Sequence, residues 1–394
     1  MAQPILIAGG GLGGLSAALA LGRKGYTVRV LEQAKKFEPI GYGIQLGPNV
    51  FPMFDRIGVT AAVMREATIP KNILMLDALS GAEVTHIPTG PNFRARFTHP
   101  YIIIHREDIH RVLIEACAAT PTVTMEGGAG VAGFEESTDG VRVALEDGRS
   151  VEGEALIGAD GLRSAVRATF VHEGEPVPIG YVAHRTIVPM HELPAHIPYR
   201  EEVVLWGGPG FHIVHYPLRH GTLFNIVAVF RTATFAERLD PAAYTTEVRK
   251  TYADAYPVMK ALTDMMDLGR RWIIADRDPI RHWGRGRVML LGDAAHPVLQ
   301  SFAQGACMAI EDGVVLAELV EHAGGDLVAA FASYRKTRLL RTARLALESR
   351  AIWSFYHAEG IARDVRNDST ARWKDDDLFR CLAWLYDGIE LPTS

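Results

Sequence analysis

The sequence predicts an α/β protein in which a Rossmann-like dinucleotide-binding domain is interrupted by an antiparallel sheet and followed by a helical C-terminal segment. Three observations predict this fold class. An apolar run, a glycine cluster and a helix-forming run follow one another near the N-terminus. Two further Gly/Asp clusters lie near residues 160 and 292. Between them, residues 180–268 carry short strand-like runs that are broken by glycine turns.

The N-terminal elements form a βαβ unit. Pro4–Ala8 is apolar, which is typical of a buried parallel strand. Leu15–Lys24 has helix-forming composition, and Gly25 is a plausible C-terminal stop. Thr27–Leu31 is rich in β-branched residues and predicts the second strand. The unit is about thirty residues long, as a dinucleotide-binding fingerprint requires.

The glycines between the first strand and the helix have separate expected roles. Gly9 permits the tight turn, Gly11 lets the backbone approach a pyrophosphate, and Gly14 lets the helix pack closely on the strand. The N–H groups at the start of the helix then face the phosphates. Glu32, at the end of the second strand, is placed to accept hydrogen bonds from ribose hydroxyls. This motif alone does not separate FAD from NAD.

The two later clusters favour FAD. Leu156–Ala159 is an apolar strand that runs into Asp160, and Leu290–Gly292 runs in the same way into Asp293. A carboxylate at the second position can bind the ribityl hydroxyls of a flavin. NAD has no ribityl chain, so a second acidic site of this kind predicts FAD.

The remaining elements follow from local composition and turn signals. Thr138–Gly140 and Glu146–Arg149 predict hairpin turns. The basic residues within 335–344 are expected on a solvated helix face. The predicted elements are a strand at 101–104, a helix at 105–118, strands within 123–158, an antiparallel sheet within 202–230, a strand at 287–291, a helix at 305–321 and mostly helix from 327 onward.

This order implies a discontinuous nucleotide-binding domain with an inserted substrate domain. The predicted division is 1–74, 97–179 and 269–345 for the FAD-binding domain, 75–96 and 180–268 for the substrate domain, and 346–394 for the helical C-terminal segment.

Together the three clusters resemble the FAD site of single-component (group A) FAD-dependent aromatic hydroxylases, over nearly the whole chain. The resemblance implies a p-hydroxybenzoate hydroxylase-like fold, FAD as cofactor and NADH as reductant, with NADPH left open. It implies that Asp160 serves both nucleotides, that Arg106 contacts the flavin side chain and that Gln45 lies by the flavin. An ordinary ion pair at a helix start is the alternative for Arg106. Gly305 and Ala306 begin a helix whose N-terminus is expected to stabilise negative charge on the reduced flavin.

Residues 211–218 are the expected reaction centre. On a strand, His212, Val214 and Tyr216 share one face, whereas His215 points the other way. His212 and Tyr216, together with Gln300, match the substrate-binding trio of family members that act on 3-hydroxybenzoate. The resemblance implies that His212 takes the phenolic proton and that Tyr216 and Gln300 orient the ring beside a C4a-hydroperoxyflavin. A hydrogen-bonded histidine inside a sheet is the alternative for His212.

The expected reaction is para hydroxylation of 3-hydroxybenzoate to gentisate by dioxygen. Salicylate and 6-hydroxynicotinate hydroxylases are alternatives, although members that act on hydroxynicotinate carry His in place of Gln45. A non-oxygenating flavin dehydrogenase or redox-sensing module is the alternative of another class. The sequence shows no evident arginine clamp for a substrate carboxylate, and it leaves Arg185, Arg219 and Tyr101 as candidates.

Bulk properties exclude several other classes. The net charge of −5 gives no electrostatic reason to expect nucleic acid. The three cysteines show no metal-ligand spacing, and no metal is expected. No stretch predicts a membrane span, so a cytoplasmic protein is expected. A homodimer is an open alternative to a monomer.

Overall fold

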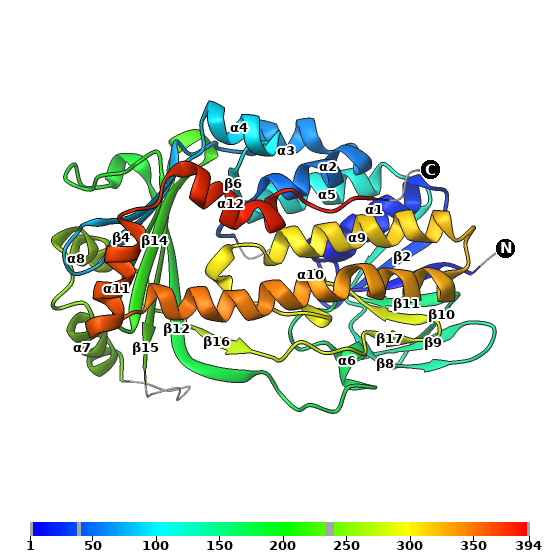
Figure 1. Ribbon diagram of the computed structural model, residues 1–394. Coiled ribbons are helices and arrows are strands. Elements are labelled where there is room, and N and C mark those ends of the chain that lie inside the picture. Colours follow the sequence, from blue (N-terminus) through cyan, green and yellow to red (C-terminus); the bar gives the residue numbers. More distant parts are fainter. Residues whose placement is uncertain (1–2, 38–40, 233–239, 392–394) are drawn as a thin grey trace.

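Two large sheets organise the chain in the computed structural model, which describes residues 3–37, 41–232 and 240–391. In Figure 1 the seven-stranded sheet lies at the left and the six-stranded sheet at the right. The long helix α10 (Leu327–Tyr356) runs lengthwise along the molecule, from beside the six-stranded sheet toward the seven-stranded sheet.

The other helices cover these sheets or connect their strands. They are α1 (Leu12–Arg23), α2 (Phe51–Ile57), α3 (Thr60–Glu66), α4 (Pro91–Phe97), α5 (Arg106–Ala118), α6 (Ala165–Ala168), α7 (Pro241–Thr251), α8 (Pro257–Asp264), α9 (Gly305–His322), α11 (Gly360–Thr370) and α12 (Asp375–Tyr386), with 3-10 turns η1 (Pro48–Val50), η2 (Met190–Glu192), η3 (Arg219–Gly221), η4 (Gly292–Ala294) and η5 (Gln300–Phe302).

The six-stranded sheet contains the predicted βαβ unit. Its order is β17 (Gly284–Arg285), β18 (Val288–Leu290), β11 (Ala155–Gly158), β1 (Ile5–Ala8), β2 (Val28–Glu32) and β7 (Val123–Gly127), parallel except for the β17–β18 pair. The three Gly/Asp clusters follow β1, β11 and β18. Because the carboxyl ends of neighbouring parallel strands meet at one edge, distant clusters converge there.

The seven-stranded sheet joins strands from two separate stretches of sequence. Its order is β16 (Trp272–Asp276), β12 (Val177–Pro189), β15 (Leu223–Arg231), β14 (Phe211–Leu218), β13 (Val203–Gly208), β4 (Asn72–Asp77) and β5 (Glu83–Pro88). All neighbours are antiparallel except β13 and β4. The predicted domain boundaries stay a prediction, and the one at 345–346 falls inside α10.

Two small sheets complete the strands. Strands β8 (Val131–Glu136), β9 (Val141–Leu145) and β10 (Ser150–Gly153) form an antiparallel meander, with the two predicted hairpin turns between them. Strands β3 (Gly43–Leu46) and β6 (Ile102–His105) pair with each other.

Small residues let α1 and α9 approach closely. A Cβ added at Gly13 would lie 2.6 Å from Leu291 Cδ2, and one added at Gly313 would lie 2.6 Å from the backbone nitrogen of Ala17. Larger side chains at either glycine would push the helices apart. This contact holds the N-terminus of α1 against the loop that follows β18.

A buried ionic cluster joins α9 to α10. Arg338 donates to Glu311 Oε2 and Asp312 Oδ1, both at 2.6 Å, and all three side chains are fully buried. Arg341 also bonds Glu311. Burial raises the pKa of Asp312, but His296 and Arg338 outweigh it and lower the pKa to about 2. The expectation of a solvated basic face is therefore wrong for Arg338 and Arg341, because their acidic partners lie on α9, and the local pattern of the basic helix does not reveal a neighbouring helix.

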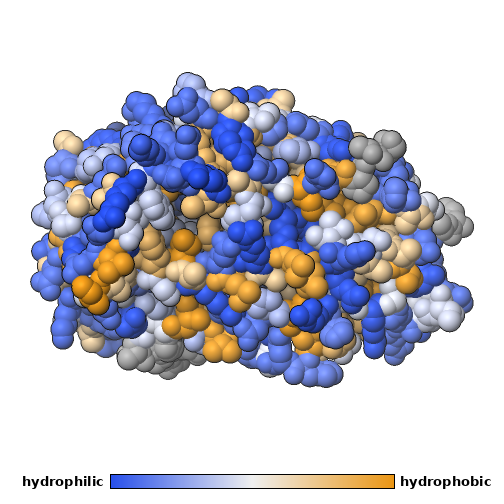
Figure 2. All heavy atoms as spheres, viewed as in Figure 1, coloured by the Kyte–Doolittle hydropathy of each residue, from blue (hydrophilic) through white to orange (hydrophobic). Residues whose placement is uncertain are grey.

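The described ranges contain no helix that is both long and apolar enough to cross a bilayer. Figure 2 shows apolar side chains dispersed among polar ones on the face where α10 and α11 lie. Leu340, Leu347, Ile361 and Val365 on these helices are more than half exposed. The homodimer stays a prediction.

Arg338→Ala is expected to destabilise the fold by about 3–5 kcal/mol, because it removes the buried cation shared by Glu311 and Asp312 and leaves them only Arg341 and His296 as partners. Thermal and urea unfolding measure the loss. The matched control is Arg372→Ala, which removes an exposed pair with Asp368 and is expected to cost less than about 1 kcal/mol. Equal effects of the two changes would contradict the importance of the buried cluster.

Candidate active site

One cavity of about 710 Å³ connects the glycine cluster after β1 with the inner face of β14. Its walls come from the start of α1, from β3, β4, β13 and β14, from the loop before α9, and from α10 and α12. Its volume is in the range of sites for small molecules and cofactors.

The glycines after β1 differ in what surrounds them. A Cβ added at Gly11 would meet no atom within 4 Å, and this residue lines the cavity. Gly9 has φ +104°, and an added Cβ would lie 2.5 Å from the carbonyl oxygen of Ala159. A Cβ at Gly14 would lie 2.1 Å from the carbonyl oxygen of Gly9. At Gly9 and Gly14 any side chain would collide with a backbone carbonyl group, so these glycines allow close backbone packing. Gly11 instead leaves open space beside the helix start, where a phosphate fits.

Glu32 lies behind this loop at the end of β2. Its carboxylate accepts the backbone N–H groups of Gly10 at 2.7 Å and Ala34 at 2.9 Å. Glu32 does not line the cavity itself. Its two backbone bonds fix the carboxylate at the base of the loop, with lone pairs left for further donors.

Asp160 caps a turn rather than facing the cavity. Ser164 Oγ and the backbone N–H of Val166 both donate to its carboxylate. Its neighbours Ala159 and Gly161 line the cavity instead. Burial raises the pKa of Asp160, and these hydrogen bonds oppose that effect.

Arg167 joins the second Gly/Asp cluster to the third. This buried side chain donates to the carbonyl oxygens of Ala294 at 2.8 Å and Ala295 at 3.1 Å. It therefore holds the loop that carries Asp293 in place. The sequence pattern placed Arg167 behind Asp160 but gave no signal for this contact.

Asp293, Arg106, Gly305 and Ala306 line the same end of the cavity. Within the described part of the chain, no group donates a hydrogen bond to Asp293 and no carboxylate pairs with Arg106. The alternative of an ordinary ion pair for Arg106 is thus not what the structure shows. The Asp293 side chain is open to the cavity; its separation from bulk water raises its pKa, and the charges of His296 and Arg106 oppose that effect. The start of α9 has no side-chain cap, so its N–H groups are open to the cavity.

This set of groups fits FAD. Unpaired helix N–H groups suit phosphates, an unpaired carboxylate suits ribityl hydroxyls, and the open space at Gly11 lets a pyrophosphate approach the backbone. These groups lie together at one end of the cavity. Glu32 and Asp160 do not line it, and their hydrogen bonds support its loops.

The other end of the cavity is formed by β14. His212, Val214 and Tyr216 line it, as strand alternation predicts. His215 lies on the opposite face, where its Nε2 accepts a hydrogen bond from Trp206 Nε1 at 3.1 Å. Burial lowers the pKa of His212 well below its usual value, and His357 lowers it further. His212 is therefore neutral at physiological pH.

Tyr216 and Gln300 each have a partner. The Tyr216 hydroxyl donates to the carbonyl oxygen of Gly43 at 2.8 Å, and burial raises the pKa of Tyr216 to about 12. Gln300, which begins η5, accepts a hydrogen bond at Oε1 from Arg185 Nη2 at 3.0 Å. The structure thus brings Arg185 to the predicted trio.

The three candidates for carboxylate binding differ in position. Arg185 and Tyr101 line the cavity, and Tyr101 donates to Gln45 Oε1 at 2.6 Å. Arg219 does not line it and instead pairs with Asp108 at 2.9 Å. Among the three, Arg185 is the cation that reaches the trio.

One further residue was not predicted from the sequence. Nε2 of His357, just after α10, lies 2.8 Å from Nδ1 of His212. No motif or spacing marks His357, because the two residues are 145 positions apart and belong to different elements.

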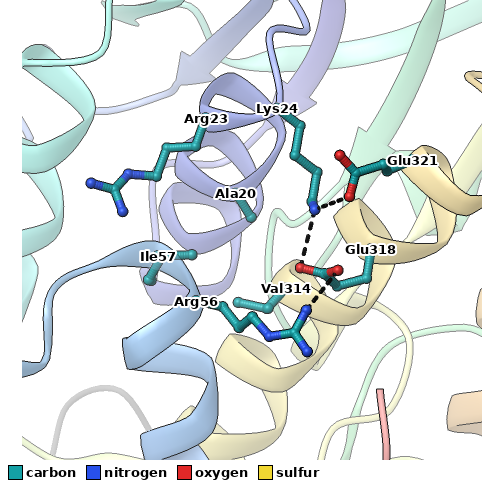
Figure 3. Close-up of a pocket in the computed structure, with 8 residues that line it drawn as sticks. All are labelled: Ala20, Arg23, Lys24, Arg56, Ile57, Val314, Glu318 and Glu321. Atoms are coloured by element: carbon teal, nitrogen blue, oxygen red, sulfur yellow. Dashed lines mark hydrogen bonds and ion pairs between the residues drawn. The ribbon is translucent and has the colours of Figure 1, made fainter. Parts of the chain in front are cut away.

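A second hollow, of about 440 Å³, lies between α1, α2 and α9 (Figure 3). In it, Glu318 bonds Lys24 at 3.2 Å and Arg56 at 2.9 Å, and Glu321 also pairs with Lys24. None of the predicted site residues lines it. These ion pairs connect the helices, and we assign the hollow no ligand.

Comparisons with known proteins agree with this geometry. A family described as "FAD binding domain" matches residues 2–348. The chain is 42% identical to a 3-hydroxybenzoate 6-hydroxylase of Polaromonas naphthalenivorans (strain CJ2), over 97% of this chain and 95% of the relative. It is 40% identical to a 3-hydroxybenzoate 6-hydroxylase of Klebsiella oxytoca, over 97% and 96%.

Among solved structures, Klebsiella pneumoniae HpxO complexed with FAD and uric acid is similar, with a TM-score of 0.86 and 26% identity, over 98% of this chain and 97% of that chain. These similarities confirm the predicted FAD cofactor and the p-hydroxybenzoate hydroxylase-like fold with its helical C-terminal segment.

Gly11→Ala is expected to weaken FAD binding at least tenfold while the apoprotein unfolds as before, because the added methyl group enters open cavity space. A tenfold loss corresponds to about 1.4 kcal/mol. Flavin titration and thermal unfolding of the apoprotein measure the two effects. Gly14→Ala is the control, since its methyl group collides with the Gly9 carbonyl and should lower stability first. Unchanged FAD affinity in Gly11→Ala would contradict a cofactor at this loop.

Proposed function

Because the chain belongs to the FAD-binding family of flavoprotein aromatic hydroxylases, we propose that it hydroxylates 3-hydroxybenzoate para to the phenolic oxygen, giving gentisate. The observation that carries this proposal is the single cavity that joins Gly11 and Asp293 to His212, Tyr216 and Gln300. Relatives of this chain at 40% identity or more carry the corresponding name, which supports the choice of substrate.

Bound FAD, reduced by NADH or NADPH, would supply the activation of dioxygen. The chain would hold the cofactor through the start of α1, Arg106, Asp293 and the start of α9. The apolar side chains that line the cavity between its two ends, such as Val214 and Val298, exclude water from the reacting centre.

His212 is the proposed general base. Its Nδ1 is occupied by His357, so Nε2 is the nitrogen left to face a ligand. A neutral imidazole at this position accepts the phenolic proton, and the electron pair left on oxygen raises electron density at the para carbon. The lowered pKa of His212 keeps the ring unprotonated before substrate binds, but it also makes the imidazole a weaker base, so the proton transfer depends on stabilisation of the phenolate by the site.

Arg185 is the proposed partner of the substrate carboxylate. Its guanidinium lies in the cavity beside Tyr216 and Gln300, and no described residue offers it a carboxylate. Burial lowers the pKa of Arg185, which reflects the cost of an unpaired cation in this place. A planar carboxylate matches the fork of N–H donors that Arg185 presents.

Product analysis tests the substrate assignment. Aerobic turnover with 3-hydroxybenzoate under ¹⁸O₂ is expected to give gentisate that carries one labelled hydroxyl. Salicylate and 6-hydroxynicotinate are the alternatives, and each is offered separately. Catechol with release of carbon dioxide from salicylate, and no product from 3-hydroxybenzoate, would contradict the proposal. Flavin reduction under nitrogen with NADH and with NADPH identifies the reductant.

His212→Ala is expected to keep FAD and to lose about 10²- to 10⁴-fold in hydroxylation rate, the usual range for a general base. The rate of gentisate formation measures this loss, and gentisate formed per reduced nicotinamide consumed measures the coupling. His215→Gln, on the opposite face of the same strand, is the control and should retain coupled turnover. Normal product formation in His212→Ala would remove this residue from the reaction.

Arg185→Gln is expected to raise the Kd of 3-hydroxybenzoate about 10- to 100-fold, since a charge-assisted pair is lost. The neutral 3-hydroxybenzamide should bind wild type and variant alike. Perturbation of the flavin spectrum measures both ligands. If the amide loses affinity as much as the acid does, then Arg185 acts on the shape of the cavity and not on the carboxylate.

A further inference from the structure

The proposed base belongs to a pair of buried imidazoles. His212 Nδ1 and His357 Nε2 are 2.8 Å apart, and the two residues are 2% and 7% exposed. Burial lowers the pKa of both rings, to about 4 for His357. Two neutral imidazoles share one proton in such a bond, so it resides either on His212 Nδ1 or on His357 Nε2.

Only one of these arrangements leaves a base in the cavity. With the proton on His212 Nδ1, the Nε2 of His212 keeps its lone pair and can accept a proton from a ligand. With the proton on His357 Nε2, His212 carries its own proton on Nε2 and is unable to accept another. Which of the two histidines carries the shared proton therefore decides whether His212 can act as a base toward a ligand.

The surroundings of His357 favour the competent arrangement. His357 caps the carbonyl end of α10, where the backbone carries negative partial charge. Burial and the charge of Arg231 lower the pKa of His357, and the Trp353 carbonyl opposes them, although no described group completes a hydrogen bond to Nδ1. A proton on His357 Nδ1 suits this environment, and it leaves Nε2 as an acceptor.

Aromatic contacts hold the His357 ring in this orientation. Its ring stacks on Tyr181 with centroids 4.8 Å apart and meets the Trp353 ring edge-on at 5.0 Å. Trp353 also lies edge-on to the His212 ring, at 5.3 Å. The pair is thus fixed by β12 and α10, outside the strand that carries the base.

Resting on the proposed function, we propose that His357 is a positioning residue: its Nε2 accepts the Nδ1 proton of His212 and keeps the Nε2 lone pair of His212 directed into the cavity. When the phenol binds, its O–H bond breaks, an N–H bond forms at His212 Nε2, and the electron pair remains on the substrate oxygen. The resulting imidazolium still donates from Nδ1 to His357. This arrangement is a tautomer lock of the kind that orients metal-binding histidines.

Other ionisable groups face the pair. They are Tyr181 on β12, Arg231 at the end of β15, Tyr356 on α10 and, beyond Arg231, Glu359. Burial raises the pKa of Tyr356. All four are retained in the variants below, so a difference between two pH profiles reports on the imidazole pair.

The test compares His357→Leu with His357→Gln in the full-length holoprotein. Leu removes the acceptor, whereas the Gln side-chain oxygen lies near the position of Nε2 and can still accept. His357→Leu is expected to lower kcat for gentisate about 10- to 100-fold, with the Kd of 3-hydroxybenzoate changed less than threefold. His357→Gln should recover most of the loss. The deficit of the Leu variant should shrink toward pH 10, because a phenol with a pKa of about 10 ionises there unaided.

Two controls separate the outcomes. His184→Leu removes a buried imidazole that bonds Tyr244 outside the cavity, and it measures the general cost of such a loss. Nitrogen-15 NMR of histidine-labelled protein, with and without FAD, reads the tautomer of His212 directly and is expected to show the proton on Nδ1. A proton on Nε2, equal losses in the Leu and Gln variants, or a deficit that persists at pH 10 would overturn the role of His357. Absence of gentisate from wild type, with Nδ1 protonated, would instead count against the proposed function alone.

Discussion

The arrangement of the site depends on the hydrogen bonds and ion pairs that the buried Asp312 carboxylate makes. Its Oδ2 accepts hydrogen bonds from the backbone N–H of Gly292 and from His296, and its Oδ1 accepts one from Arg338. These bonds join the loop of the third Gly/Asp cluster, α9 and α10 at one point. Charges so completely removed from water are tolerated only when each is paired, so the three segments are held in one geometry.

Helix α10 extends from the ion pair between Asp312 and Arg338 to the far end of the cavity. Its thirty residues span roughly 45 Å at 1.5 Å per residue, and Figure 1 shows it passing from one sheet toward the other. Ile352 and Tyr356 of this helix line the cavity, and His357 follows it directly. One rigid element therefore connects the loop that carries Asp293 to the strand that carries His212. The two ends of the cavity, at Asp293 and at His212, are therefore positioned relative to each other by a helix that is part of neither sheet.

Local sequence was sufficient for the elements and for much of the site. Apolar runs, glycine turns and strand alternation identified the βαβ unit, placed His212 and Tyr216 on one face, and marked Gly11, Arg106 and Asp293, which the structure brings to one cavity. Each of these inferences rests on conformational preferences or periodicities that act over a few residues. The same reasoning misplaced Arg338, because the basic pattern of a helix does not reveal acidic partners on another helix.

The sequence by itself determined the fold class, the nucleotide-binding loop and the faces of the strands, since backbone geometry and side-chain alternation are local properties. Only the tertiary structure decided which groups meet across long separations. It directed the Asp160 carboxylate to a turn, set Arg185 against Gln300 and placed His357 on His212. Such contacts depend on how sheets and helices pack, and packing depends on the whole chain at once.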